Sequence, residues 1–188
     1  MSKEHNHRGR ILVVEDQGIV ATDIQRCLED DGFEVTAIAA SMDEAIREAS
    51  RSRPDLVLMD IRIQGEAAGI DAADHLHRHF GLPIVYLSAH DDRDTMLRAH
   101  RTEPMAFLFK PFKAAELSRT VEIALNRSWV EVRDRERTFL SVMDAIGDAV
   151  VTTDSQGNAR YMNRAAEELT AGGRNWLWAS RLPMSCIL

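Results

Sequence analysis

Five side chains with catalytic or metal-binding chemistry follow short apolar runs in the first two thirds of the chain. They are three carboxylates, one hydroxyl and one ammonium: Glu15, Asp16, Asp60, Ser88 and Lys110. Clustered carboxylates repel one another unless a positive charge lies between them. Carboxylate oxygens that leave room for water suit Mg²⁺. A carboxylate can also attack a phosphoryl donor, and a metal, an ammonium and a hydroxyl stabilise the transferring group. These residue types therefore indicate a Mg²⁺-dependent phosphoacceptor site.

The positions of these residues suggest their roles. Asp60 stands alone after the third apolar run, so we expect it to be the nucleophile. Glu15 and Asp16 are adjacent after the first run and are expected to hold the metal. Lys110 and Ser88 are expected to bind phosphoryl oxygens after the transfer.

Strands and helices must alternate to bring this set together. Continuous apolar runs such as Ile11–Val14 are typical of strands buried on both faces of a parallel sheet. Ser41 and Glu44 form a capping box that should begin a helix. Strands are expected at 11–14, 33–39, 56–59, 84–87 and 105–109, and helices at 19–28, from 41 onward, and at 70–80, 91–101 and 114–126. This order predicts an α/β fold with a five-stranded doubly wound parallel sheet, whose ligands lie beyond the carboxyl ends of the strands.

Four motifs occur in order along residues 10–127: Glu15-Asp16, Leu-Val-Leu-Met-Asp-Ile around Asp60, Ser88-Ala89, and Phe-Leu-Phe-Lys-Pro-Phe at 107–112. In this combination the segment resembles the receiver domain of two-component response regulators. The resemblance implies a flavodoxin-like receiver fold. It also implies that Asp60 and the backbone carbonyl of Arg62 complete the Mg²⁺ site with Glu15 and Asp16.

The same resemblance implies how the site works. Asp60 would take a phosphoryl group from a histidine kinase or a histidine phosphotransfer protein. The chain would catalyse its own phosphorylation and dephosphorylation and would not be an enzyme acting on a separate substrate. Ser88 and Phe107 would form the conformational switch. Two positions depart from the family: Gln64 stands where Pro is frequent and precedes a long loop at 65–69, and Phe107 lacks the hydroxyl of the commoner Tyr.

A helical linker is expected at 128–146. Its apolar positions keep a 4–3 spacing that is interrupted by one charge, at Glu136. The spacing is typical of a coiled coil, which would make the protein a homodimer. A single amphipathic helix packed on its own domain is the other interpretation. The seam positions are Leu125, Trp129, Val132, Glu136, Phe139, Met143 and Ile146.

Residues 147–188 are expected to form an incomplete PAS-like α+β segment with an atypical tail. Strands at 150–153 and 160–163 flank a turn that contains Asp154 and Gly157, and a helix should follow from Ala165. With Asn163, this pattern is similar to the opening of a PAS sensor domain. After Thr170 no periodicity remains, which suggests a lost reading frame or a truncation; a genuine short output peptide is the alternative.

Composition excludes some classes of protein. The formal net charge is −7 over 188 residues, and no basic run marks a nucleic-acid surface. No apolar stretch reaches the roughly 18 residues of a membrane helix, so we expect a cytoplasmic protein. Residues 1–9 read as a disordered polar tail, with His5 and His7 as part of it.

Three histidines in one expected helix leave a question open. His75 and His79 are four residues apart and could bind zinc, whereas a solvated helix face is the plainer interpretation. His77 lies between them in the sequence.

The main functional hypothesis is a phosphorylation-dependent signalling switch. The alternatives are the front part of a hybrid histidine kinase, or a receiver that shuttles phosphoryl groups to a phosphotransfer protein.

Overall fold

The computed structural model describes residues 8–64, 68–89 and 93–171 of the 188-residue chain. The chain divides into two compact units, Met1–Val130 and Glu131–Leu188. The unexplained tail after Thr170 lies almost wholly outside the described residues. Among the described helices, none is long and apolar enough to cross a membrane.

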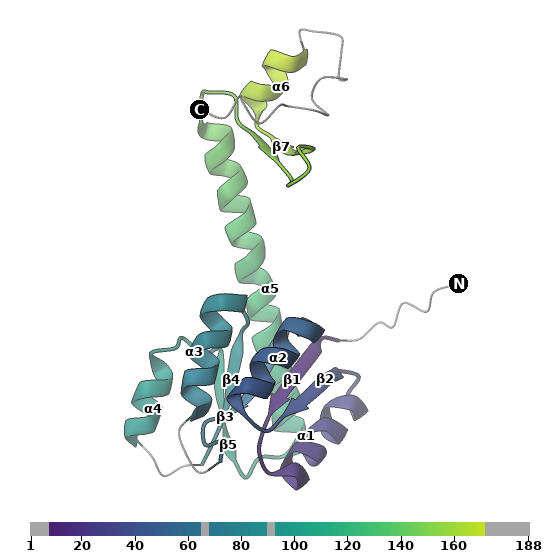
Figure 1. Cartoon of the computed structure of the whole chain (residues 1–188), viewed down its shortest axis with the longest axis vertical. Helices are drawn as coiled ribbons and strands as arrows, with labels where there is room; N and C mark the ends of the chain where they lie inside the picture. The colour runs from purple at the N-terminus through teal and green to yellow at the C-terminus, as the bar shows by residue number, and fades with distance from the viewer. Residues whose placement is uncertain (1–7, 65–67, 90–92, 172–188) are drawn as a thin grey trace, which may run out of the picture. The chain divides into compact units, whose positions relative to one another are not determined.

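The first unit is built on a five-stranded parallel sheet, as the alternating sequence pattern predicts (Figure 1). The strand order is β2-β1-β3-β4-β5, with both outer strands reached by crossovers. All five strands are short, and β3 and nearly all of β1 are buried, because helices cover both faces. The strands are β1 (Arg10–Val14), β2 (Glu34–Ala39), β3 (Leu56–Asp60), β4 (Ile84–Ala89) and β5 (Ala106–Lys110).

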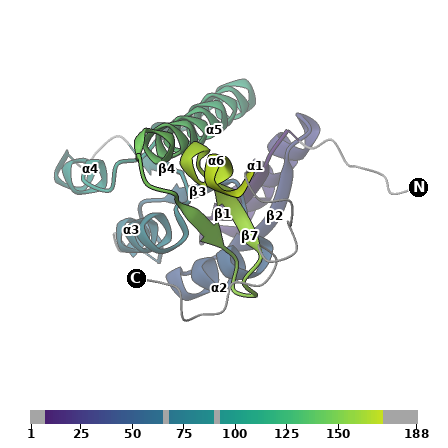
Figure 2. The same ribbon diagram turned by 90° about the horizontal axis from the view of Figure 1, so that it is seen from above.

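Helices pack on the two faces of this sheet and enclose two apolar cores. Figure 2 shows α5 on one side of the sheet and α2 and α3 on the other. One core joins the sheet to α1 and α5, and the other joins it to α2, α3 and α4. The helices are α1 (Gly18–Asp30), α2 (Met42–Ser52), α3 (Ala68–Phe80), α4 (Arg93–His100) and α5 (Ala114–Ala145).

Local sequence signals act as expected at the start of α2. The Ser41 hydroxyl accepts a hydrogen bond from the backbone N–H of Glu44 at 3.3 Å. The Glu44 carboxylate in return accepts one from the backbone N–H of Ala40 at 2.8 Å. This reciprocal capping satisfies two backbone donors that would otherwise have no partner in the first helical turn.

Two element boundaries and one predicted seam position differ from what the sequence suggested. α5 continues without interruption to Ala145, so the helix expected at 114–126 and the helical linker expected at 128–146 form one helix. Leu125 is buried in the core of the first unit at 1% exposure, so it cannot belong to an intermolecular seam. Ala68 and Gly69 already belong to α3 and are not part of the preceding loop.

The expected tail also ends earlier than residue 9. The Arg8 guanidinium forms an ion pair with Glu122 at 2.5 Å and lies 5.0 Å from the ring centroid of Phe33. Gly9 is buried against Leu125. Both residues therefore pack on the first unit, and of the expected tail residues 1–7 lie outside the described part of the chain.

The second unit contains a small antiparallel hairpin. It is formed by β6 (Val151–Thr153) and β7 (Ala159–Met162) and is followed by α6 (Arg164–Ala171). The Asp154 carboxylate closes the turn by accepting hydrogen bonds from the backbone N–H groups of Gln156 and Asn158, each at 2.9 Å. Such a turn is expected where Asp, Gly and Asn cluster between two short strands.

Candidate functional site

Parallel pairing brings the predicted side chains to one edge of the sheet. β3 is the central strand, and its last residue, Asp60, pairs with Leu87 just before Ser88 on β4. Ser88 and Ala89 in turn pair with Phe109 and Lys110 at the end of β5. The register therefore places the carboxyl ends of the strands side by side, as expected for a binding site in a doubly wound fold.

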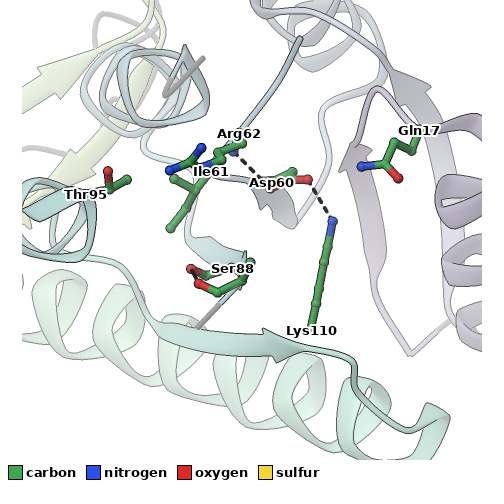
Figure 3. A pocket seen from close by; sticks show the side chains of 8 residues that line it. Gln17, Asp60, Ile61, Arg62, Ser88, Thr95 and Lys110 are labelled. Carbon is green, nitrogen blue, oxygen red and sulfur yellow. Dashed lines mark hydrogen bonds and ion pairs between the residues drawn. The ribbon is translucent and has the colours of Figure 1, made fainter. Parts of the chain in front are cut away.

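Lys110 is the centre of the charge arrangement. Its ammonium lies 2.7 Å from Oδ2 of Asp60 and 2.5 Å from Oε2 of Glu15. Figure 3 shows this side chain directed at Asp60. The other Asp60 oxygen, Oδ1, accepts a hydrogen bond of 3.0 Å from the backbone N–H of Arg62. Both oxygens of the Asp60 carboxylate are thus held in a fixed direction.

Glu15, Asp16 and Asp60 form a group that fits a cation. Each offers one carboxylate oxygen, and these oxygens lie within 4.8 Å of one another. Oδ2 of Asp16 accepts a hydrogen bond from the backbone N–H of Gln64 at 2.7 Å. Oδ1 of Asp16 is buried and has no hydrogen-bond partner within the described part of the chain. A buried acceptor without a donor is costly, and a metal ion would satisfy it.

Burial and charge both act on the titration of this group. Burial raises the pKa of the Glu15 carboxyl. The hydrogen bond from Lys110 lowers this pKa and repulsion from Asp60 raises it, and the net effect is a raised pKa. Burial would lower the pKa of Lys110, but its hydrogen bonds to Asp60 and Glu15 outweigh burial and raise it. The ammonium therefore keeps its proton and remains the cation of the site.

A pocket of about 150 Å³ opens beside Asp60. Ser88 lies at its edge and donates a hydrogen bond to the carbonyl of Ala89 at 2.9 Å. Two further lining residues, Gln17 and Thr95, were not identified from the sequence. Figure 3 shows them on opposite sides of Asp60. Gln17 directly follows the acidic pair, so its position alone could have indicated it, whereas Thr95 lies in α4 without a motif.

Gly69 is the third residue that sequence reasoning missed. A Cβ atom added at this position would lie 1.9 Å from the carbonyl oxygen of Asp60. Its backbone N–H also donates to the carbonyl of Ile61 at 3.3 Å. The first turn of α3 can approach the end of β3 this closely because residue 69 has no side chain.

Phe107 lies away from the charged group, on β5 beside Tyr86 of β4. Its half-buried ring is stacked with the Tyr86 ring at a centroid distance of 5.5 Å, and the His100 ring lies 5.1 Å away. Arg62 directly follows Ile61 and lines the pocket with Ser88. The structure thus brings Glu15, Asp16, Asp60, Arg62, Ser88 and Lys110 together, with Phe107 outside the pocket.

Comparisons with known proteins agree with this architecture. The response regulator receiver domain family matches residues 11–122. The transcriptional regulatory protein PdtaR of Mycobacterium tuberculosis is 36% identical over 118 residues, which cover 63% of this chain and 57% of PdtaR. The phyllosphere-induced regulator PhyR of Methylorubrum extorquens is 34% identical over 116 residues, covering 61% of this chain and 43% of PhyR. The chain therefore spans less than two thirds of the length of these relatives.

Solved structures give the same result. The signal receiver domain of a modulated diguanylate cyclase from Desulfovibrio desulfuricans G20 has a TM-score of 0.62 and 33% identity, covering 65% of this chain and 98% of that domain. The receiver domain of NtrX from Brucella abortus has a TM-score of 0.56 and 34% identity, covering 62% and 98% respectively.

Proposed function

The chain belongs to the response regulator receiver domain family, and from this premise we propose that Asp60 is its phosphoacceptor. The phosphoryl group would come from a histidine kinase or a histidine phosphotransfer protein. The observation that carries the proposal is the pairing of one ammonium, Lys110, with both Asp60 and Glu15 beside an unsatisfied Asp16 oxygen. This combination suits the transfer of a charged group to a carboxylate.

In the proposed reaction, an oxygen of Asp60 attacks phosphorus while the bond to the donor imidazole nitrogen breaks. Glu15, Asp16, Asp60 and the backbone carbonyl of Arg62 would hold Mg²⁺, which supplies charge neutralisation on the phosphoryl oxygens. The Lys110 ammonium donates to the same group and replaces part of its present contact with Asp60. The protein thus promotes its own phosphorylation and dephosphorylation, and it does not turn over a separate substrate.

The same pocket supplies a switch. The Ser88 hydroxyl now donates to Ala89, so it must rotate before it can donate to a phosphoryl oxygen. Ser88 and Phe107 lie on neighbouring strands, and Phe107 packs against His100 of α4. Movement of Ser88 would therefore change the space available to the Phe107 ring and shift α4 and β5.

The phosphoacceptor assignment is tested with Asp60→Asn. The purified chain is incubated with acetyl phosphate and Mg²⁺, and its phosphate content is measured before and after hydroxylamine treatment. Wild type and Asp30→Asn, a control at the exposed end of α1, should gain hydroxylamine-sensitive phosphate. Asp60→Asn should gain none while keeping its circular dichroism spectrum. Wild-type incorporation into Asp60→Asn would exclude this residue as the acceptor.

We also propose that the second half of α5 pairs two chains in parallel. Trp129, Val132 and Phe139 are 42%, 51% and 48% exposed in the single chain, which is a large apolar surface for one helix. Glu136 lies in the same helix, but its side chain is outside those that the structure describes. Sedimentation should give a dimer that Glu136→Leu tightens. A wild type that stays monomeric at every concentration would contradict the pairing.

For the second unit we propose the start of a PAS-type sensor domain. The support is the β6–β7 hairpin, its Asp154 turn and the buried Asn163 that precedes α6. Asn163 donates to the carbonyls of Met143 and Asp148, each at 2.9 Å, and accepts from the backbone N–H of Val150 at 2.8 Å. It thereby ties the end of α5 to the hairpin within this unit.

A further inference from the structure

The three histidines of α3 separate into a pair and a single residue. The rings of His75 and His79, one helical turn apart, have centroids 4.3 Å from each other. His77 behaves differently: its Nδ1 lies 3.1 Å from the carbonyl oxygen of Leu82, in a half-buried position. That hydrogen bond holds the His77 ring against the segment that enters β4. The receiver chemistry uses none of these three residues.

We propose that His75 and His79 bind a divalent transition metal ion between their imidazole rings. Side chains four residues apart lie on the same helix face, and imidazole nitrogen is a preferred ligand of Zn²⁺, Cu²⁺ and Ni²⁺. Two rings that share one ion through bonds of about 2.0–2.1 Å must lie only a few ångström apart. The observed pair meets this requirement. Within the described part of the chain, neither ring makes a hydrogen bond that would have to be broken first.

Asp71 does not reach this pair as a third ligand, because among the described residues only Glu15, Asp16 and Asp60 bring three ligand atoms together. It lies four residues before His75, one turn nearer the start of α3, and its side chain is 70% exposed. The two imidazoles would therefore hold the ion without a carboxylate, and water would complete its coordination.

This site differs in chemistry from the carboxylate group at Asp60. The carboxylate group offers hard oxygen ligands, which suit Mg²⁺. The histidine pair offers nitrogen, for which Mg²⁺ competes poorly. Excess Mg²⁺ should therefore occupy the first site and leave the second open, and this allows the two to be measured separately.

The test is a calorimetric titration of the tag-free full chain with Ni²⁺ in millimolar Mg²⁺. The starting protein carries His5→Ala and His7→Ala, because tail histidines would add background binding. We expect one Ni²⁺ per chain. His75→Ala and His79→Ala should each weaken Ni²⁺ binding at least tenfold, and Asp71→Asn should leave it unchanged.

The control is His77→Ala, which removes an imidazole from the same helix but should leave Ni²⁺ affinity unchanged. Ni²⁺ should also raise the melting temperature of the starting protein and of His77→Ala, but not that of His79→Ala or His79→Gln. Circular dichroism verifies that the variants fold. Equal affinity in His75→Ala and the starting protein, or an equal loss in His77→Ala, would overturn the site. Failure to phosphorylate Asp60 would not affect this result, because Ni²⁺ binding needs no phosphoryl donor.

Discussion

Replacing Gly69 by alanine adds one methyl group at the closest contact between a helix and the end of β3. The new Cβ would lie 1.9 Å from the carbonyl oxygen of Asp60 and 2.9 Å from the carbonyl oxygen of Ile61. Contacts below 3.0 Å are essentially never seen for Cβ atoms, so α3 or the end of β3 must move by about 1 Å. Backbone atoms form both contacts, so no side chain can rotate away to relieve them.

The energetic cost follows from this geometry. Overpacking a filled site costs about 1–3 kcal/mol, and the higher helix propensity of alanine returns at most about 1 kcal/mol. We therefore expect Gly69→Ala to lower the free energy of unfolding by about 1–2 kcal/mol. Misplacing a reacting group by about 1 Å can slow a reaction by about 10²-fold. On the proposed function, phosphorylation of Asp60 by acetyl phosphate should slow by that order.

Hydrogen exchange of the β3 amides is the appropriate stability assay, because it reports the first unit independently of the second. Gly18→Ala is the matched control: Gly18 also opens a helix, and a Cβ there has no neighbouring atom within 4 Å. It should be neutral or slightly stabilising. If Gly69→Ala protects the β3 amides as well as wild type and is phosphorylated at the same rate, the close-approach argument is wrong.

Three further perturbations test the charges and buried polar groups. Lys110→Met leaves Glu15 and Asp60 without their ammonium, so the free energy of unfolding in chelator should fall by about 3 kcal/mol. Added Mg²⁺ should restore part of this loss. Equal urea midpoints of the variant with and without Mg²⁺ would count against the site. Burial raises the pKa of Tyr86 to about 12. The contribution of its neutral hydroxyl to the stability of the fold is therefore complete below pH 10 and is lost as pH rises toward 12. Absorbance titration of Tyr161→Phe, with Tyr86 as the remaining tyrosine, should show this late ionisation, and an ordinary pKa near 10 would refute it. Asn163→Asp should melt the second unit, seen as faster exchange of β6 and β7 amides with unchanged β3 amides; unaltered β6 and β7 exchange would show that the Asn163 donors are dispensable.

The sheet and the site edge were predictable because one physical cause dominates each. Ile11–Val14 and Leu56–Met59 are apolar at every position, which suits strands buried on both faces and little else. Once the strands are parallel, their carboxyl ends must meet, so Asp60, Ser88 and Lys110 converge without any knowledge of side-chain angles.

Contacts between backbones were not predictable in the same way. Gly69 lies in a Gly- and Ala-rich stretch that reads as a loop, and the reason for the glycine is the Asp60 carbonyl on another element. The apolar spacing of Leu125 fits both a coiled-coil seam and a core position, and periodicity cannot separate the two. The structure decides for the core, because Leu125 is buried in the apolar cluster that joins α1 and α5 to the sheet.

The charge balance of the site bears on the proposed reaction. Three carboxylates face one ammonium, and Lys110 contacts two of them while one oxygen of Asp16 has no donor within the described residues. A phosphoryl donor would bring further negative charge into a group that is already short of positive charge. A divalent cation held by Glu15, Asp16 and Asp60 would supply the missing positive charge, since Lys110 alone cannot offset both the carboxylates and the incoming oxygens. In the proposed reaction, the Lys110 ammonium that holds Asp60 in place would turn toward the phosphoryl group. This turn would release Glu15, which directly follows β1. Phosphorylation of Asp60 would therefore act directly on the end of β1.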